Sequence, residues 1–168
     1  MAVFFYEGLT GRYGLEETGG ALTHLWLEGK EKAGGGRNVA AWMPDAVNGD
    51  LEETPLLREA KAQLDAYFAG RLKDFSLPLA PAGTAFQKKI WGLLQEIPYG
   101  TTRTYGEIAV SAGDAKACRA VGMANNRNPL PILIPCHRVV GANGGLVGYG
   151  GGLDIKLKLL QLEGIWLL

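Results

Sequence analysis

Two prolines in residues 77–83 constrain this chain of 168 residues more than any other feature. Pro78 and Pro81 lack a backbone N–H and restrict the residues before them, so this stretch fits neither a helix nor a central strand. Short aromatic and β-branched runs precede it, and apolar residues at helical spacing follow it. We therefore predict an N-terminal lobe over 1–78, a linker over 79–84 and a C-terminal domain over 85–168.

The N-terminal lobe reads as a small sheet followed by a helix, which is an α/β (α+β) pattern. Segments 3–6, 11–16 and 21–27 are strand-like and are separated by glycine turns. From Pro55 to Gly70 the apolar residues change to a spacing of three to four, which is typical of an amphipathic helix. These apolar residues are Leu56, Leu57, Ala60, Leu64, Tyr67 and Phe68.

The C-terminal domain is predicted to be mainly helical. Thr84 can cap a helix that ends near Pro98, with one apolar stripe made of Phe86, Ile90, Trp91, Leu94 and Ile97. Thr104 and Glu107 fit the capping box of a short helix that ends near Val110. After a glycine-containing turn, Asp114 can cap a second helix through about Asn125. This pair resembles a helix-turn-helix, and a generic αα-hairpin fits equally well.

Charge is distributed unevenly along the chain. The 17 basic and 17 acidic residues give a net charge of zero, and 47% of residues are hydrophobic, which excludes a disordered tail protein and gives no overall sign of a nucleic-acid binder. Residues 1–85 nevertheless carry a net charge of −4 and residues 86–168 a net charge of +4. The basic half is the part that suits an anionic partner.

The remaining global features predict a cytoplasmic protein. Two cysteines are too few for a disulfide scaffold and suit a reducing compartment. The first residues lack a positive segment, and no apolar run approaches the ~18 residues that a membrane span needs. Glycine is the one anomaly, because its 25 residues are about twice the average usage of ~7%.

The presumed second helix is unusually rich in small residues over 115–124. Lys116 and Arg119 are its charged members. Small side chains allow close packing against another helix, and they also allow close approach to a nucleic-acid groove with Arg119 projecting. The composition alone leaves these two interpretations equal.

The reactive centre is predicted at Cys136. Residues 130–134 read as a buried strand, and Pro135 then turns the chain into Cys136, His137 and Arg138. A thiolate needs a nearby base and cationic or dipolar surroundings, and these neighbours offer both. Adjacent residues do not share a helix face, so we expect His137 to act through a bridging water. Cys118 has no such neighbours and is interpreted as structural.

Two rival chemistries fit less well. Two cysteines and two histidines without CxxC or HxxxH spacing do not make a zinc site, so no metal is expected. The glycines over 148–152 are not followed by the Lys-Ser/Thr of a phosphate loop. We interpret them as a loop beside the thiol, with Tyr149 as its only large side chain.

Residues 128–141, NPLPILIPCHRVVG, resemble the active-site signature of the O6-alkylguanine-DNA alkyltransferases. The similarity continues in further blocks in the same order, over about half of the chain. These blocks are Phe86-Gln87, 97–100, 104–109, 119–122, Gly148-Tyr149 and 162–164.

The resemblance implies a ribonuclease-H-like N-terminal lobe and irreversible transfer of an alkyl group from O6-alkylguanine, and from O4-alkylthymine, to Cys136. His137 would relay the thiol proton through water and Glu163 would orient His137. Asn128 would hold the turn before the active site, and Tyr105 would rotate a phosphate and donate a hydrogen bond to the base. It also implies a set of DNA-contacting residues, Thr104, Lys116, Arg119 and Ala120, and a base pocket made of Pro131, Val139, Tyr149 and Gly150.

The implied partner is alkylated double-stranded DNA, bound in the minor groove by a monomer with the target base flipped out and Arg119 in its place. No cofactor and no membrane are involved. The sequence departs from some relatives at Gly150, where they have a serine, and lacks their N-terminal zinc ligands. Because Cys136 is present, a non-catalytic module that recognises the lesion is the second hypothesis. An unrelated cysteine hydrolase is the third.

Overall fold

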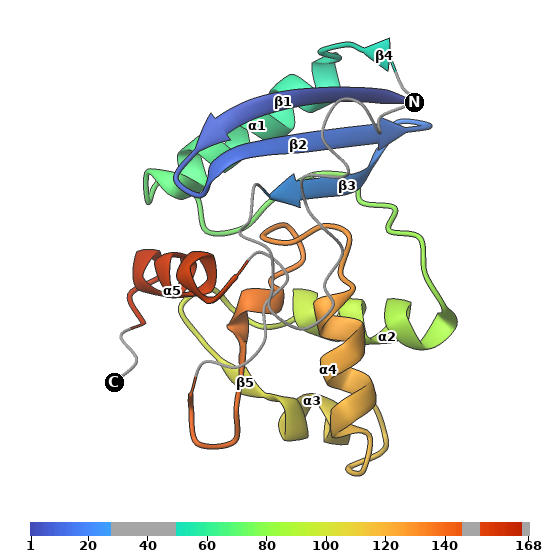
Figure 1. The fold of residues 1–168 in the computed structure, drawn as a ribbon, viewed down its shortest axis with the longest axis vertical. Coiled ribbons are helices and arrows are strands. Elements are labelled where there is room, and N and C mark those ends of the chain that lie inside the picture. The colour runs from blue at the N-terminus through green and yellow to red at the C-terminus, as the bar shows by residue number, and fades with distance from the viewer. Residues whose placement is uncertain (28–49, 146–151, 166–168) are drawn as a thin grey trace. The chain divides into compact units, whose positions relative to one another are not determined.

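The structure, a computed structural model, describes residues 1–27, 50–145 and 152–165. It divides the chain into two units, Met1–Pro81 and Ala82–Leu168 (Figure 1). The division falls inside the segment 79–84 that the sequence predicts to be a linker. No helix in the described ranges is long and apolar enough to cross a membrane.

The N-terminal unit contains a four-stranded sheet built from β1 (Ala2–Gly8), β2 (Gly11–Thr18), β3 (Ala21–Leu27) and β4 (Asp50–Leu51). The strand order is β3-β2-β1-β4, with antiparallel pairing among the first three strands and parallel pairing of β1 with β4. The turn between β2 and β3 uses Gly19 and Gly20, whose φ angles of +61° and +83° suit the tight hairpin. The three predicted strands are confirmed.

Helix α1 (Pro55–Phe68) covers one face of this sheet. Thr54 caps it by accepting the Leu57 N–H at 3.2 Å, and the proline at its first position suits a helix start. Its buried side, including Leu64, packs towards the paired Tyr6 and Tyr13, and the Phe68 ring meets the edge of Tyr13 at 6.3 Å. The predicted helix is therefore confirmed.

Beside β3, the proline segment adds a short stretch of strand-like pairing. The Leu22 N–H donates to the Pro78 carbonyl, and the Ala80 N–H donates to the Leu22 carbonyl, both at 2.8 Å. Leu79 thereby forms an isolated parallel bridge with Leu22. The prolines flank the paired residue, so their missing N–H groups do not interrupt these two bonds.

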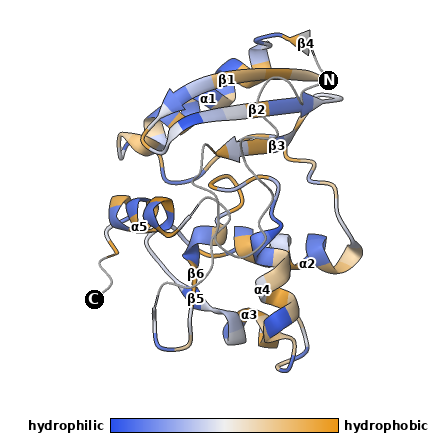
Figure 2. Cartoon of the chain, viewed as in Figure 1, coloured by the Kyte–Doolittle hydropathy of each residue, from blue (hydrophilic) through white to orange (hydrophobic). Residues whose placement is uncertain are grey.

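The C-terminal unit contains the helices α2 (Ala85–Gln95), α3 (Tyr105–Ser111), α4 (Cys118–Asn126) and α5 (Leu153–Leu162), the 3-10 turn η3 (Cys136–Arg138), and the short parallel pair β5 (Arg103–Thr104) and β6 (Val139–Val140). Capping boxes start α2 and α3, which confirms the helix starts predicted at Thr84 and Thr104. Figure 2 shows hydrophilic and hydrophobic residues interspersed along these helices. The helices bury mainly their apolar sides, and α4 and α5 each also bury one polar residue, Asn125 and Lys156.

The apolar stripe of α2 forms the centre of this unit. Trp91 is 1% exposed and its indole N–H donates to the Ala124 carbonyl of α4 at 2.9 Å, which fixes α2 against α4. Ile90, Leu94 and Ile97 are buried with it. Phe86 is an exception at 38% exposed, because it lies in the first turn of α2 and lines an open groove of about 180 Å³ between α2 and α4.

The predicted start of the second helix at Asp114 is wrong. The Asp114 carboxylate accepts the Lys116 N–H at 2.9 Å, and its carbonyl accepts the Ala117 N–H at 3.0 Å. These bonds close a separate turn, since an aspartate side chain competes with the helix for nearby N–H groups. Helix α4 begins only at Cys118, so Lys116 precedes it and Arg119 lies in its first turn.

The buried strand predicted over 130–134 does not form. The Ile134 N–H donates to the Leu130 carbonyl at 2.8 Å, and a bridge between Pro131 and Ile134 closes a tight turn. Ile132 has a φ of +73°, which is unusual for a β-branched residue. Pro131, within the segment, lacks a donor that a strand would need, and the short strand β6 follows the cysteine instead of preceding it.

Candidate active site

Cys136 opens the 3-10 turn η3 and is 3% exposed. Its N–H donates to the Ile134 carbonyl at 2.7 Å, and the Arg138 N–H donates to the Pro135 carbonyl at 3.0 Å. The backbone on both sides of the thiol is therefore fixed by short hydrogen bonds. A buried thiol in such a turn has a defined direction of attack.

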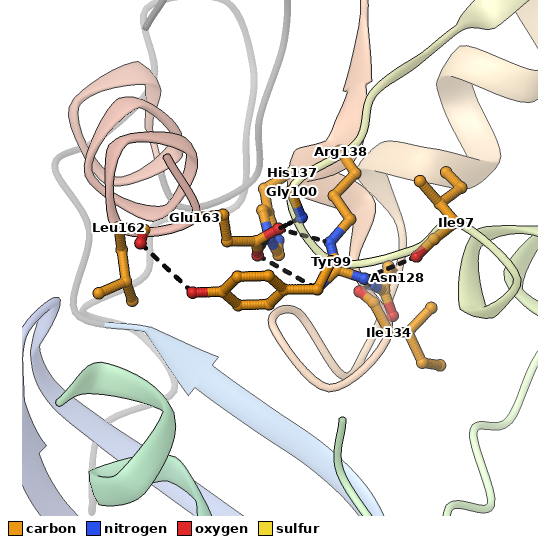
Figure 3. A network of polar contacts seen from close by, with 9 residues as sticks. All are labelled: Ile97, Tyr99, Gly100, Asn128, Ile134, His137, Arg138, Leu162 and Glu163. Atoms are coloured by element: carbon orange, nitrogen blue, oxygen red, sulfur yellow. Dashed lines mark hydrogen bonds and ion pairs between the residues drawn. The ribbon is translucent and has the colours of Figure 1, made fainter. Parts of the chain in front are cut away.

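The buried carboxylate of Glu163 binds the two residues that follow Cys136 (Figure 3). The Oε2 atom lies 2.6 Å from His137 Nε2 and accepts from Arg138 Nη2 at 3.2 Å. The Oε1 atom accepts from Arg138 Nε at 2.8 Å and from the Gly100 N–H at 3.0 Å. Four N–H groups satisfy the carboxylate, so a negative charge is stable there despite complete burial.

The end of α5 and residues 97–100 bring these groups together. Glu163 is the C-terminal cap of α5, with its N–H bonded to the Leu159 carbonyl at 3.1 Å. Gly100 has a φ of +74° and approaches the Glu163 backbone so closely that a Cβ would stand 3.3 Å from the carbonyl oxygen. The Tyr99 hydroxyl donates to the Leu162 carbonyl at 3.3 Å, and Arg138 also donates to the Ile97 carbonyl at 2.7 Å.

His137 is held in its neutral form. Burial lowers its pKa below the ordinary histidine value, while the hydrogen bond and charge of Glu163 oppose this shift and the cations of Arg138 and Lys156 reinforce it. Because Arg138 already compensates Glu163, the carboxylate does not force a proton onto the ring. A neutral imidazole whose Nε2–H donates to a carboxylate has Nδ1 as its basic atom, which is the form a proton acceptor requires.

Asn128 holds the turn that precedes the cysteine (Figure 3). Its side-chain Nδ2 donates to the Ile134 carbonyl at 2.8 Å, and its Oδ1 accepts the Leu130 N–H at 2.9 Å. The same amide thus clamps both ends of the turn. Asn128 therefore lies between the end of α4 and the turn that carries Cys136.

Tyr105 is the first residue of α3 and lies near the thiol. Burial and, to a smaller degree, a negative charge on Cys136 raise its pKa to about 12, although a hydrogen bond with the side chain of Asn125 acts to lower it. The phenol consequently keeps its proton at neutral pH and can donate a hydrogen bond.

The predicted DNA-contacting residues lie on α3 and α4 and before α4. Thr104 caps α3 by accepting the Glu107 N–H at 3.1 Å. Lys116, Arg119 and Ala120 are exposed, whereas Val121, Ala124 and Asn125 turn into the unit. The exposed side of α4 therefore carries Arg119 and Ala120 together with Met123, and Lys116 lies just before the helix.

The predicted base pocket is only partly described. Pro131 is half-buried in the turn before Cys136, and Val139 is fully buried in β6. Tyr149 and Gly150 lie outside the described residues. Among the described residues, no cluster of three or more His, Cys, Asp or Glu could hold a metal ion.

Sequence reasoning missed several members of this site. It assigned Arg138 only a general positive charge, whereas the guanidinium is committed to Glu163 and Ile97. Lys156 was not singled out, yet it is fully buried and donates to the Val139 carbonyl at 2.6 Å. Cys118 was expected to be structural, but it is exposed at the start of α4, because that helix begins later than predicted.

Comparisons with known proteins agree with this geometry. Two family models match the chain: "6-O-methylguanine DNA methyltransferase, DNA binding domain" over residues 85–165, and the "ribonuclease-like domain" of the same proteins over 37–81. The methylated-DNA–protein-cysteine methyltransferase of Methanosarcina acetivorans is 64% identical over 114 residues, which cover 68% of this chain and 73% of that protein. The constitutive enzyme of Bacillus subtilis is 54% identical over 125 residues, covering 74% and 76%.

A solved structure is similar along nearly the whole chain. Mycobacterium tuberculosis OGT in complex with DNA has a TM-score of 0.81 and 40% sequence identity, covering 97% of this chain and 92% of that one. The C-terminal unit brings a cysteine, a histidine and a buried carboxylate together, and it matches a DNA-binding domain, which defines a class of DNA-binding proteins with a reactive thiol. The chain belongs to the methylated-DNA–protein-cysteine methyltransferase family. The predicted ribonuclease-like N-terminal domain is confirmed at the level of the family.

Proposed function

We propose that this protein repairs alkylated DNA by direct reversal, moving the alkyl group of O6-alkylguanine, and of O4-alkylthymine, onto Cys136. The observation that carries the proposal is the buried pair of His137, which directly follows Cys136, and Glu163, whose interacting atoms are 2.6 Å apart. Family membership supports the same reaction. Each molecule acts once, because the thioether that forms has no route back to a thiol.

The chemistry balances without a cofactor. The Cys136 thiol gives its proton, through a water, to Nδ1 of neutral His137. The thiolate then attacks the alkyl carbon, so a C–S bond forms and the C–O6 bond breaks, with the electron pair going to the guanine. The guanine takes up one proton, which balances the one that His137 received, and remains in the DNA as the normal base. Glu163 orients His137 and stabilises its charge, in the manner of a nucleophile–base–acid relay.

DNA recognition is assigned to the exposed side of α4 and the start of α3. The O6 substituent lies within the stacked duplex, so the nucleotide must leave the stack before a buried thiol reaches it. Arg119, exposed in the first turn of α4, fills the vacated space, and Tyr105 donates to the extruded base. Small residues on α4 suit the narrow minor groove, and the protein acts as a monomer.

The decisive experiment is the intact mass of the protein after incubation with a duplex that contains one O6-methylguanine. We expect a gain of one methyl group, located on the Cys136 peptide, in the native protein and in Cys118→Ser, but not in Cys136→Ser. Absence of this gain in a folded native protein refutes the proposal. Tight binding to the damaged duplex without transfer would instead establish the non-catalytic recognition module.

A second experiment tests the role of Arg119. Arg119→Ala is expected to slow repair of the duplex more than reaction with free O6-benzylguanine, which needs no extrusion. The single-turnover rate on each substrate is the measurement. An equal loss on both would remove Arg119 from the extrusion step.

A further inference from the structure

Asn125 is the buried polar residue of α4 that the proposed function does not use. It is 1% exposed and lies on the inner side of the helix with Val121 and Ala124. Its Nδ2 donates to the backbone carbonyl of Cys136 across a long 3.4 Å contact. Its Oδ1 is buried and has no hydrogen-bond partner among the described residues.

An asparagine at this position is unfavourable for packing alone. A buried acceptor without a donor loses its hydration and gains nothing in return, whereas a leucine, which branches at the same atom, would extend the apolar contacts of Val121 and Ala124. The amide therefore does not serve the stability of the core. Its value must lie in the groups that it contacts.

The groups that the Asn125 amide contacts belong to two residues of the candidate active site. One is the carbonyl of the nucleophile's own residue. The other is the phenol of Tyr105, whose pKa the Asn125 side chain lowers by a hydrogen bond. Gly122 lies one turn before Asn125 on α4. A Cβ atom at Gly122 would stand 3.9 Å from the Tyr105 ring, so this ring packs along the same side of the helix. The amide of Asn125 therefore faces both Tyr105 and Cys136.

We propose that Asn125 is a positioning residue that orients the Tyr105 hydroxyl for donation to the extruded base and ties it to the Cys136 turn. A phenol oxygen that accepts an amide N–H directs its own O–H elsewhere, and accepting one hydrogen bond strengthens the one that it donates. The second contact, from the Asn125 amide to the Cys136 carbonyl, fixes η3 relative to α4. This inference rests on the proposed function, because it needs a base to receive the Tyr105 proton.

The test is a double-mutant cycle on Asn125→Leu and Tyr105→Phe with free O6-benzylguanine, so that DNA binding does not enter. We expect Asn125→Leu to lower the single-turnover rate about tenfold, the size of one lost hydrogen bond in the reacting complex. In the Tyr105→Phe background the same change should have little further effect, because its target is gone. The melting temperature of Asn125→Leu should be unchanged or higher, since the orphaned acceptor is removed.

The control is Asn126→Leu, the same substitution at the next, exposed residue, which should keep the native rate. A spectroscopic readout is independent of the rate: the Cζ chemical shift of Tyr105 should change in Asn125→Leu and stay constant in Asn126→Leu. A native rate in Asn125→Leu, additive losses in the cycle, or a fall in melting temperature that parallels the rate would each overturn the inference. Failure of the native protein to take up the alkyl group would refute the proposed function itself.

Discussion

Glu163→Gln is the substitution that most sharply tests the buried relay. The change keeps the shape of the side chain and removes its charge. A glutamine oxygen can still accept from Arg138 Nε and the Gly100 N–H, which lie 2.8 Å and 3.0 Å from Oε1. The amide nitrogen then faces His137 Nε2, where the native atoms are 2.6 Å apart.

Two consequences follow from these distances. An amide N–H donates to Nε2, which moves the proton of the imidazole to Nδ1 and removes the basic atom that should receive the thiol proton. Loss of a general base typically slows a reaction by about 10²–10⁴-fold. Arg138, buried at 6% exposure, also loses its counter-charge, and breaking a buried ion pair costs about 3–5 kcal/mol. For a chain of this size the melting temperature should fall by about 6–20 °C.

Two quantities are measured. The rate of methyl transfer is obtained by rapid quench and intact mass, and the melting temperature is obtained from thermal unfolding followed from well below to well above the temperature of the rate assay. Glu96→Gln, an exposed glutamate in the same unit, is the matched control and should change neither quantity. A Glu163→Gln protein that is folded at the assay temperature and transfers methyl groups at the native rate would refute the relay. A large loss of rate with native stability would refute the estimate for the ion pair with Arg138.

Three further predictions concern the same unit. At Ile132, whose φ is +73°, Ile132→Gly should be more stable in urea unfolding than Ile132→Ala by about 1 kcal/mol, and the order should reverse at Ile134. Burial lowers the pKa of His137 in the folded protein below the value of about 6.5 in the unfolded chain. As the pH falls below about 6.5, the unfolded chain binds a proton that the folded protein does not, so the melting temperature should decline with pH in this range and be independent of His137 above it. Thr84→Ala should cost about 1 kcal/mol of unfolding free energy by removing the cap on the Gln87 N–H, and Thr84→Ser should restore it.

Local chemistry made much of this architecture predictable. The capping boxes at Thr84 and Thr104 are reciprocal bonds between residues three apart, so residue types at fixed spacing predict them. Asn128 similarly bonds within six residues along the chain. The strands of the N-terminal unit follow from glycine turns and aromatic runs.

The rest depends on contacts that spacing does not encode. Glu163 reaches Arg138 across 25 residues, and neither residue carries a local sign of the other. Helix α5 has no side-chain cap, and its charged and apolar residues nearly alternate, so its helical period is weak. At Asp114 the capping rule gave the wrong helix start, because this residue, a favourable N-cap, closes a separate turn before α4. Asn125 looked like an ordinary helix end, and only burial reveals it.

The position of Glu163 at the end of α5 gives the chain an order of maturation. Cys136 and His137 are synthesised first, and their partner carboxylate arrives 26 residues later. Until α5 docks, His137 has no carboxylate to orient it and Arg138 has no counter-charge. A chain still emerging from the ribosome therefore carries a cysteine without its relay. Under the proposed reaction, the thiol therefore gains its oriented proton acceptor only in the finished domain.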